Sequence, residues 1–117
     1  MRYQPLNEKK VVRNIKYLVE KRRYFRNSKL TSEQLADELG ISRCSFSKAV
    51  NGIMGMTFSE YINNVRLENA VKILEDNKRN LTIEAIAIKS GYSTPSTFYR
   101  QYKRKYGKTP TSRKQGD

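Results

Sequence analysis

The chain has 117 residues, enough for one domain or for two small subdomains that share a core. It carries 24 Lys and Arg residues against 11 Asp and Glu residues, a formal net charge of +13. So large an excess of one sign favours a polyanionic partner, above all nucleic acid, over an acidic small molecule. The single cysteine excludes an internal disulfide, and the lack of histidine removes the usual zinc ligand and imidazole base.

The sequence also lacks the motifs of common enzymes. We find no Gly-rich phosphate loop, no nucleophile motif and no clustered pair of carboxylates. We therefore expect no catalysis, no cofactor and no metal. The stretch MRYQPLNEKK lacks the apolar run of a signal peptide, and no stretch approaches the length of a membrane span. These features predict a cytoplasmic protein without a membrane partner.

The first predicted element is an amphipathic helix within residues 1–29. Its apolar residues recur at helical spacing and are expected to close the first core; they are Val11, Val12, Ile15, Leu18 and Val19. The segment ends in EKRRYFRNSK, whose basic side chains are either a solvated cluster or phosphate contacts, and both interpretations stay open. These basic residues are Lys21, Arg22, Arg23 and Arg26.

Residues 30–56 and 81–117 contain two copies of one sequence unit. LTSEQLADELGIS, from Leu30, matches LTIEAIAIKSGYS, from Leu81, at a constant offset. After one inserted residue the match resumes and pairs Phe46 with Phe98 and Thr57 with Thr109. One supersecondary unit has therefore been used twice.

Each copy predicts a short helix followed by a turn. Thr31 is expected to begin the first helix in a capping box completed by Gln34, and Thr82 to cap its counterpart. Gly40 and Gly91 are expected to end these helices, since glycine adopts the left-handed conformation without steric cost.

A second helix follows each turn. Ser42 is its predicted N-cap in the first copy. In the second copy the turn is one residue longer, so Thr94 becomes the cap and Pro95 the first helical residue. A helix, a short glycine-containing turn and a second helix form a helix-turn-helix. A tandem pair in so basic a chain is much more specific than a single match.

The second helix of each copy is expected to bury one face. In the first copy the apolar arc contains Phe46, Ala49, Val50 and Ile53. In the second copy aromatic residues recur at every fourth position; they are Phe98, Tyr102 and Tyr106.

The opposite faces carry polar and basic side chains that can enter a major groove and read base edges, although a solvated surface is the alternative. Both copies place a basic residue at the same site, Lys48 and Arg100, and Arg can contact guanine through two hydrogen bonds. Cys44 is the weakest candidate because cysteine is more often buried, and Tyr99 borders both faces. The candidate base-reading residues are Cys44, Ser47, Lys48, Asn51, Ser96, Tyr99 and Arg100. The candidate phosphate contacts are Arg43, Lys103, Arg104, Lys105 and Lys108.

Residues 57–80 predict a connecting helix that starts at a capping box of Thr57 and Glu60 and runs to about Asn77. Its apolar residues change faces, first Phe58, Tyr61, Ile62 and Val65, then Leu67, Ala70, Val71 and Leu74. We expect a strut shared by two small cores. About 20 residues span roughly 30 Å, close to the roughly 34 Å between successive major-groove turns. After the second unit, Thr109 and Pro110 predict the cap and first turn of a brief last helix.

With these motifs the chain resembles the DNA-binding domain of the AraC/XylS family of bacterial transcription regulators over residues 30–110. The most specific segments are GYSTPSTFYRQYKRKYGKTP and GMTFSEYINNVRLENA. The resemblance implies an all-α module of about seven helices, with two helix-turn-helix subdomains joined by a long shared helix. It implies that both recognition helices enter successive major grooves of double-stranded DNA and regulate transcription, with RNA polymerase as a further partner. Arg113 stands where the family usually has an aromatic residue.

By position, the resemblance implies base contacts from Cys44, Ser47 and Lys48 in the first motif and from Ser96, Tyr99 and Arg100 in the second. Family members usually carry an additional sensing or dimerising domain. VNGIMGMTFSEYIN is similar to the subset in which the module ends a larger sensor protein. We therefore expect an excised fragment, with a stand-alone short regulator as the alternative.

Two other classes of function remain open. A basic helical module that binds RNA or an anionic membrane surface would share the charge, but it needs exposed aromatic residues or one long apolar face. A protein-interaction domain with an acidic partner is the third class. Most aromatic residues fall on the predicted core faces, which favours the DNA-binding interpretation.

Overall fold

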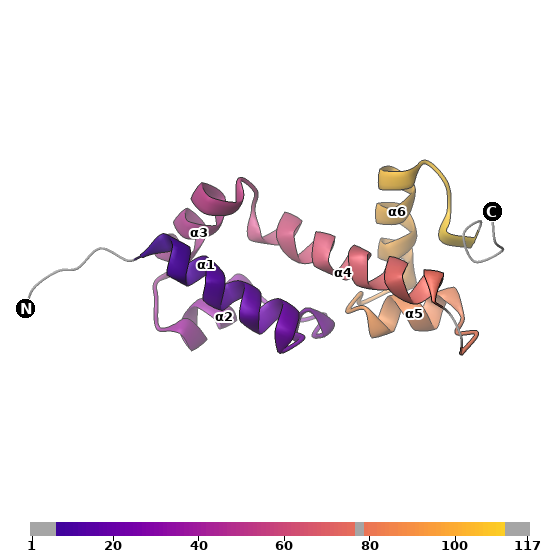
Figure 1. The fold of residues 1–117 in the computed structure, drawn as a ribbon, viewed down its shortest axis with the longest axis horizontal. Coiled ribbons are helices and arrows are strands. Elements are labelled where there is room, and N and C mark those ends of the chain that lie inside the picture. Colours follow the sequence, from indigo (N-terminus) through magenta and orange to yellow (C-terminus); the bar gives the residue numbers. More distant parts are fainter. Residues whose placement is uncertain (1–6, 77–78, 112–117) are drawn as a thin grey trace, which may run out of the picture. The chain divides into compact units, whose positions relative to one another are not determined.

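The computed structural model describes residues 7–76 and 79–111, and every regular element in these ranges is helical. This confirms the all-α prediction. The elements are α1 (Glu8–Lys16), η1 (Tyr17–Lys21), η2 (Tyr24–Arg26), α2 (Ser32–Leu39), α3 (Arg43–Ala49), η3 (Val50–Met54), α4 (Phe58–Glu75), α5 (Ile83–Lys89) and α6 (Pro95–Tyr106). Among the described residues, 7–24 and 30–62 form one compact unit, and 25–29, 63–76 and 79–111 form a second (Figure 1).

The core of the first unit forms where α1, which continues into η1, packs against α2, α3 and η3. The five apolar residues predicted for the N-terminal helix are all buried. Phe46 and Val50 are fully buried beside them, and the Phe46 ring meets that of Phe58 edge-on at 5.3 Å. The predicted amphipathic helix is therefore confirmed.

Ile53 is the exception among the predicted core residues of the first unit. Its side chain is 44% exposed, so its assignment to the buried arc was wrong. The helix changes at Val50 from α-helical to π-helical winding, which continues to Met54. A π-helix closes its hydrogen bonds over five residues instead of four. The rotation per residue then falls below the 100° assumed, and Ile53 moves out of the core.

The predicted N-terminal caps are present, with one difference between the two copies. Thr31 and Gln34 form the complete capping box, with both hydrogen bonds at 3.1 Å. Ser42 and Thr82 accept bonds from the backbone N–H groups three residues later. Thr94 precedes Pro95 as predicted but makes no side-chain cap bond; its hydroxyl lies 3.3 Å from that of Thr97.

This difference predicts unequal costs for removing the two hydroxyls of the second helix-turn-helix. Thr82→Ala loses a bond to an otherwise unpaired amide and should lower the free energy of unfolding by about 1 kcal/mol. Thr94→Ala loses no cap bond, so it should change the free energy of unfolding by no more than about 0.5 kcal/mol. Urea denaturation of both variants measures this, and equal losses would contradict the cap assignment.

The long helix α4 switches its buried face as the sequence predicted. Tyr61 and Ile62 are buried in the first unit. Leu67, Ala70 and Leu74 are buried in the second, where they form one cluster with residues of α5 and α6. The helix ends at Glu75, and the predicted end at Asn77 lies outside the described residues.

The core of the second unit is built around a buried phenylalanine, like the core of the first. Phe98 is fully buried like Phe46, and its ring lies 5.4 Å from that of Tyr92 and 5.9 Å from that of Tyr102. In Figure 1, α6 stands across α5. Pro110 is buried and begins a helical stretch, whereas Arg113 lies outside the described residues.

A buried arginine holds the second unit together at a point that the sequence analysis did not predict. Arg66 of α4 is only 9% exposed. Its Nε donates to the carbonyl oxygen of Phe25 at 2.9 Å, and its Nη2 donates to that of Asn27 at 3.0 Å. Gly91 packs on the same carbonyl: a Cβ there would lie 2.0 Å from the Phe25 oxygen. The segment 25–27 is thus clamped between α4 and the turn before α6.

Candidate nucleic-acid interface

The first candidate surface is the solvent face of α3. Phe46 and Ala49 turn into the core, and this leaves Cys44, Ser47 and Lys48 exposed on the opposite side. The predicted division of this helix into two faces therefore holds through α3. Asn51 is also exposed, but it belongs to the π-helical turn η3.

Arg43 stands at the start of the same helix and already has a partner. Its Nη2 lies 3.0 Å from Glu33 Oε1 of α2, with the two side chains 74% and 54% exposed. A solvent-exposed ion pair is worth only about 0–1 kcal/mol. A phosphate group can therefore displace the carboxylate at little cost, and the predicted phosphate contact is compatible with the pair.

The second candidate surface is the solvent face of α6. Phe98 and Tyr102 are buried, while Ser96, Arg100 and Lys103 are exposed. The guanidinium of Arg100 donates from Nη2 to the hydroxyl of Thr97, but at 3.5 Å this bond is at the limit for a hydrogen bond. Arg100 is consequently free to reach away from the helix.

Tyr99 lies at the border of this surface. It is half-buried, packs against the core cluster of the second unit, and has its ring centroid 6.3 Å from that of Phe98. Part of the ring therefore supports the core. Among the predicted base-reading residues, Tyr99 is the one that the structure does not place fully in solvent.

A basic cluster ends α6. Lys103, Arg104 and Lys105 occupy its last turn and are exposed, and Lys108 follows beyond Gly107. Helix α6 has no acidic residue. Positive charge at a helix C-terminus also stabilises the helix dipole. The cluster thus has a local structural role besides the electrostatic attraction that it offers to a polyanion.

The two surfaces are equivalent through the repeat. Lys48 and Arg100 occupy matching positions on α3 and α6, two residues after the fully buried Phe46 and Phe98. A glycine of left-handed conformation follows in each unit, Gly55 after η3 and Gly107 after α6. The structure thus gives each unit one exposed helix face with a basic residue at the same site.

The described part of the chain shows no sign of a metal centre or of a membrane segment. Within residues 7–76 and 79–111, no group of three His, Cys, Asp or Glu side chains is placed to bind a metal ion. No helix in these ranges combines the length and the apolar character needed to cross a membrane.

Comparison with known proteins identifies the class and then the family. A family profile described as a helix-turn-helix domain matches residues 35–115. The chain is 35% identical over 80 residues to the HTH-type transcriptional regulator AlkR of Acinetobacter baylyi, an alignment that covers 68% of this chain. The matched part of this chain spans 26% of the length of AlkR and 5% of the length of another, longer relative.

Solved structures share the fold. The C-terminal domain of AraT, a response regulator from Geobacillus stearothermophilus, is 26% identical with a TM-score of 0.81, over 100% of this chain and 89% of that one. The DNA-binding domain of AdpA, a global transcriptional factor solved with a target DNA, is 17% identical with a TM-score of 0.76. The match covers 89% of this chain and 88% of the AdpA chain. The chain belongs to the AraC-type helix-turn-helix family of DNA-binding domains from transcription regulators.

Proposed function

We propose that the chain recognises a specific sequence of double-stranded DNA through α3 and α6, each in a major groove, and thereby regulates transcription at a bacterial promoter. The observation that carries this proposal is the match between the two units. Each buries its phenylalanine, Phe46 or Phe98, and exposes a basic residue at the equivalent position, Lys48 or Arg100. AdpA, which shares the fold, is held on a target DNA in its own structure.

Within this proposal the exposed side chains divide into two roles. Residues on the exposed faces of α3, η3 and α6 read base edges; they are Cys44, Ser47, Lys48, Asn51, Ser96, Tyr99 and Arg100. Basic residues at the helix ends contact phosphates and fix the register without carrying sequence information. They are Arg43, Lys103, Arg104, Lys105 and Lys108. The domain acts by binding alone, without catalysis, in the cytoplasm where the promoter lies. RNA polymerase and an attached sensor domain are its proposed further partners.

Arg100→Ala is expected to weaken specific binding by about 1–3 kcal/mol and to relax the preference at one base pair. Lys105→Ala should weaken all sequences equally and reduce the salt slope of binding by about 1. Both residues are exposed on α6, so neither change should unfold the domain. Selection of bound duplexes from a random library at stated salt, followed by competition binding, measures both effects.

Arg13→Ala is the matched control, because Arg13 is exposed on α1 outside both candidate surfaces. It should leave the selected sequence unchanged. An Arg100→Ala protein that selects the same bases with unchanged affinity would show that the exposed face of α6 does not read DNA.

The exposure of the aromatic residues favours duplex DNA over single-stranded RNA. Proteins that read single strands stack the bases on aromatic side chains. Among the described residues only one aromatic side chain, Tyr17, is exposed, and it belongs to η1 and to neither α3 nor α6. Equal affinity for random duplexes, single strands and anionic vesicles would instead support the non-specific alternative.

A further inference from the structure

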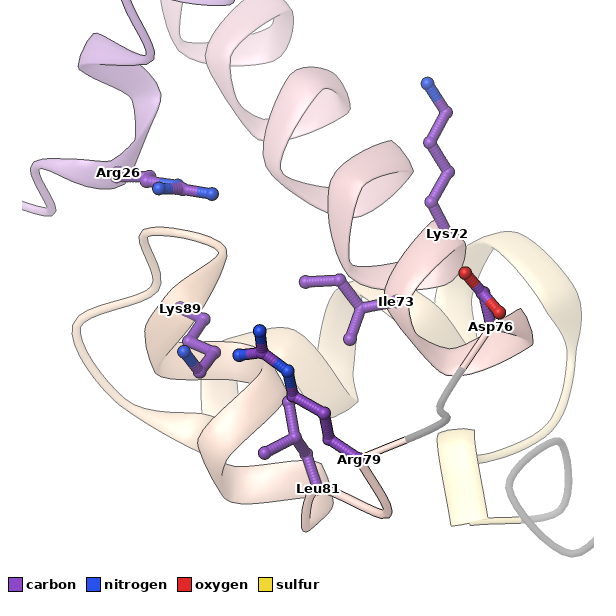
Figure 2. A pocket seen from close by; sticks show the side chains of 7 residues that line it. All are labelled: Arg26, Lys72, Ile73, Asp76, Arg79, Leu81 and Lys89. Atoms are coloured by element: carbon purple, nitrogen blue, oxygen red, sulfur yellow. The ribbon is translucent and has the colours of Figure 1, made fainter.

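A basic pocket opens in the second unit, and its lining contains none of the predicted DNA-reading residues of α6. It has a volume of about 420 Å³ and is bordered by the last turns of α4, by α5 and by the segment clamped by Arg66 (Figure 2). Its lining residues include none from α6. Four are cations and one is an anion, a net charge of +3, namely Arg26, Lys72, Arg79, Lys89 and Asp76.

The floor of this pocket is apolar. Ile73 and Leu81 line it, and both are partly buried hydrophobic residues packed against the core of the second unit. The pocket therefore combines a fixed apolar floor with charged walls.

The cations are not spread evenly around the floor. Figure 2 shows the side chain of Ile73 and the guanidinium of Arg79 extending into the same space, with Arg26 and Lys89 on its other side. The ammonium of Lys72 points away from that space. Three cations therefore surround the apolar floor, and two of them are arginines, which bind carboxylates through paired hydrogen bonds.

We propose that this pocket binds an acidic peptide segment of another protein, in which carboxylates flank a large apolar side chain. The volume lies within the range of about 300–1,000 Å³ found for small-ligand sites, enough for one apolar side chain and its neighbours. The apolar side chain covers Ile73 and Leu81, while Arg26, Arg79 and Lys89 pair with the carboxylates.

A DNA phosphate fits this lining less well. A phosphate group offers no apolar surface to bury on Ile73 and Leu81. Since α6 contributes nothing to the pocket, peptide binding and DNA reading can occur on the same molecule.

Methyl NMR of the intact chain tests the proposal. The probe is a synthetic peptide of repeated Asp-Asp-Leu triplets, added to protein with labelled isoleucine and leucine methyl groups. We expect the signals of Ile73 and Leu81 to shift on titration. The shifts should be lost with a peptide that has Asn in place of Asp, and also with one that has Ser in place of Leu.

Two charge-reversal variants provide the matched comparison. Arg79→Glu with Lys89→Glu changes two exposed cations of the pocket, and Lys9→Glu with Lys10→Glu makes the same change on α1. The pocket variant should lose peptide binding and the α1 variant should keep it. Circular dichroism of both variants establishes that the fold is unchanged.

Three results would overturn the proposal. These are no shift of the pocket methyl groups with the acidic peptide, equal binding by the two charge-reversed variants, or shifts caused by a random duplex instead of the peptide. The last result would assign the pocket to DNA phosphates. Because the peptide titration requires no DNA, failure of this site and failure of DNA reading can be distinguished.

Discussion

Gly91→Ala is expected to lower the free energy of unfolding by about 3 kcal/mol or more. Gly91 has φ +99°, and a Cβ would lie 2.0 Å from the carbonyl oxygen of Phe25 and 2.9 Å from Nε of Arg66. The first of these atoms belongs to the backbone and is itself held by Arg66, so it cannot move without breaking a buried hydrogen bond. Overpacking and left-handed strain therefore act together, and urea denaturation measures their sum.

Gly40→Ala is the matched control for this substitution. Gly40 occupies the corresponding turn of the first unit, with φ +71° and no atom within 4 Å of the added Cβ. Only the conformational strain remains there, about 1–2 kcal/mol. If the two alanine variants lost equal stability, the close approach of Gly91 to Phe25 would not be a feature of the folded protein.

Arg66→Ala is expected to cost about 3 kcal/mol of unfolding free energy. It removes two hydrogen bonds from a charged donor, worth about 1.5–3 kcal/mol each, and leaves the carbonyl oxygens of Phe25 and Asn27 without this donor. Burial lowers the pKa of the Arg66 guanidinium, an effect that the nearby Tyr92 partly offsets. The lowered pKa reflects the desolvation cost of this charge, and that cost keeps the net loss below the sum of two full bonds.

Two further variants separate the clamp from the charge. Arg66→Lys keeps the charge but lacks the planar fork that reaches two carbonyl groups, so its stability should fall between those of the alanine variant and the unmodified protein. Lys72→Ala, at an exposed position on the same helix, should change stability by no more than about 0.5 kcal/mol. A lysine variant as unstable as the alanine variant would mean that the second carbonyl bond is essential.

The sequence predicted those features of the fold that depend on neighbouring residues. The caps at Thr31, Ser42 and Thr82 involve partners three residues away, and the structure contains all three. The face switch of α4 and the burial of Phe46 and Phe98 follow from helical period alone, and both are confirmed. Local hydrogen bonding and periodicity are thus sufficient for this part of the fold.

Features that depend on distant contacts could not be predicted in this way. Arg66 and Phe25 are 41 positions apart, so no local pattern indicates their hydrogen bond. Gly91 was predicted only as a helix stop, whereas its main constraint is the approach of Phe25. The roles of the candidate DNA-reading residues remain predictions, because their exposure establishes access but not contact.

The π-helical turn after α3 limits how far the two units can be compared. α6 stays α-helical from Pro95 to Tyr106, whereas the first unit changes its winding at Val50. Lys48 precedes that point and matches Arg100 in the sequence repeat, whereas Asn51 lies in the π-helical turn and its counterpart Lys103 lies in α-helical winding. The proposed DNA-contacting roles therefore carry over between the two units at Lys48 and Arg100 but not at Asn51 and Lys103.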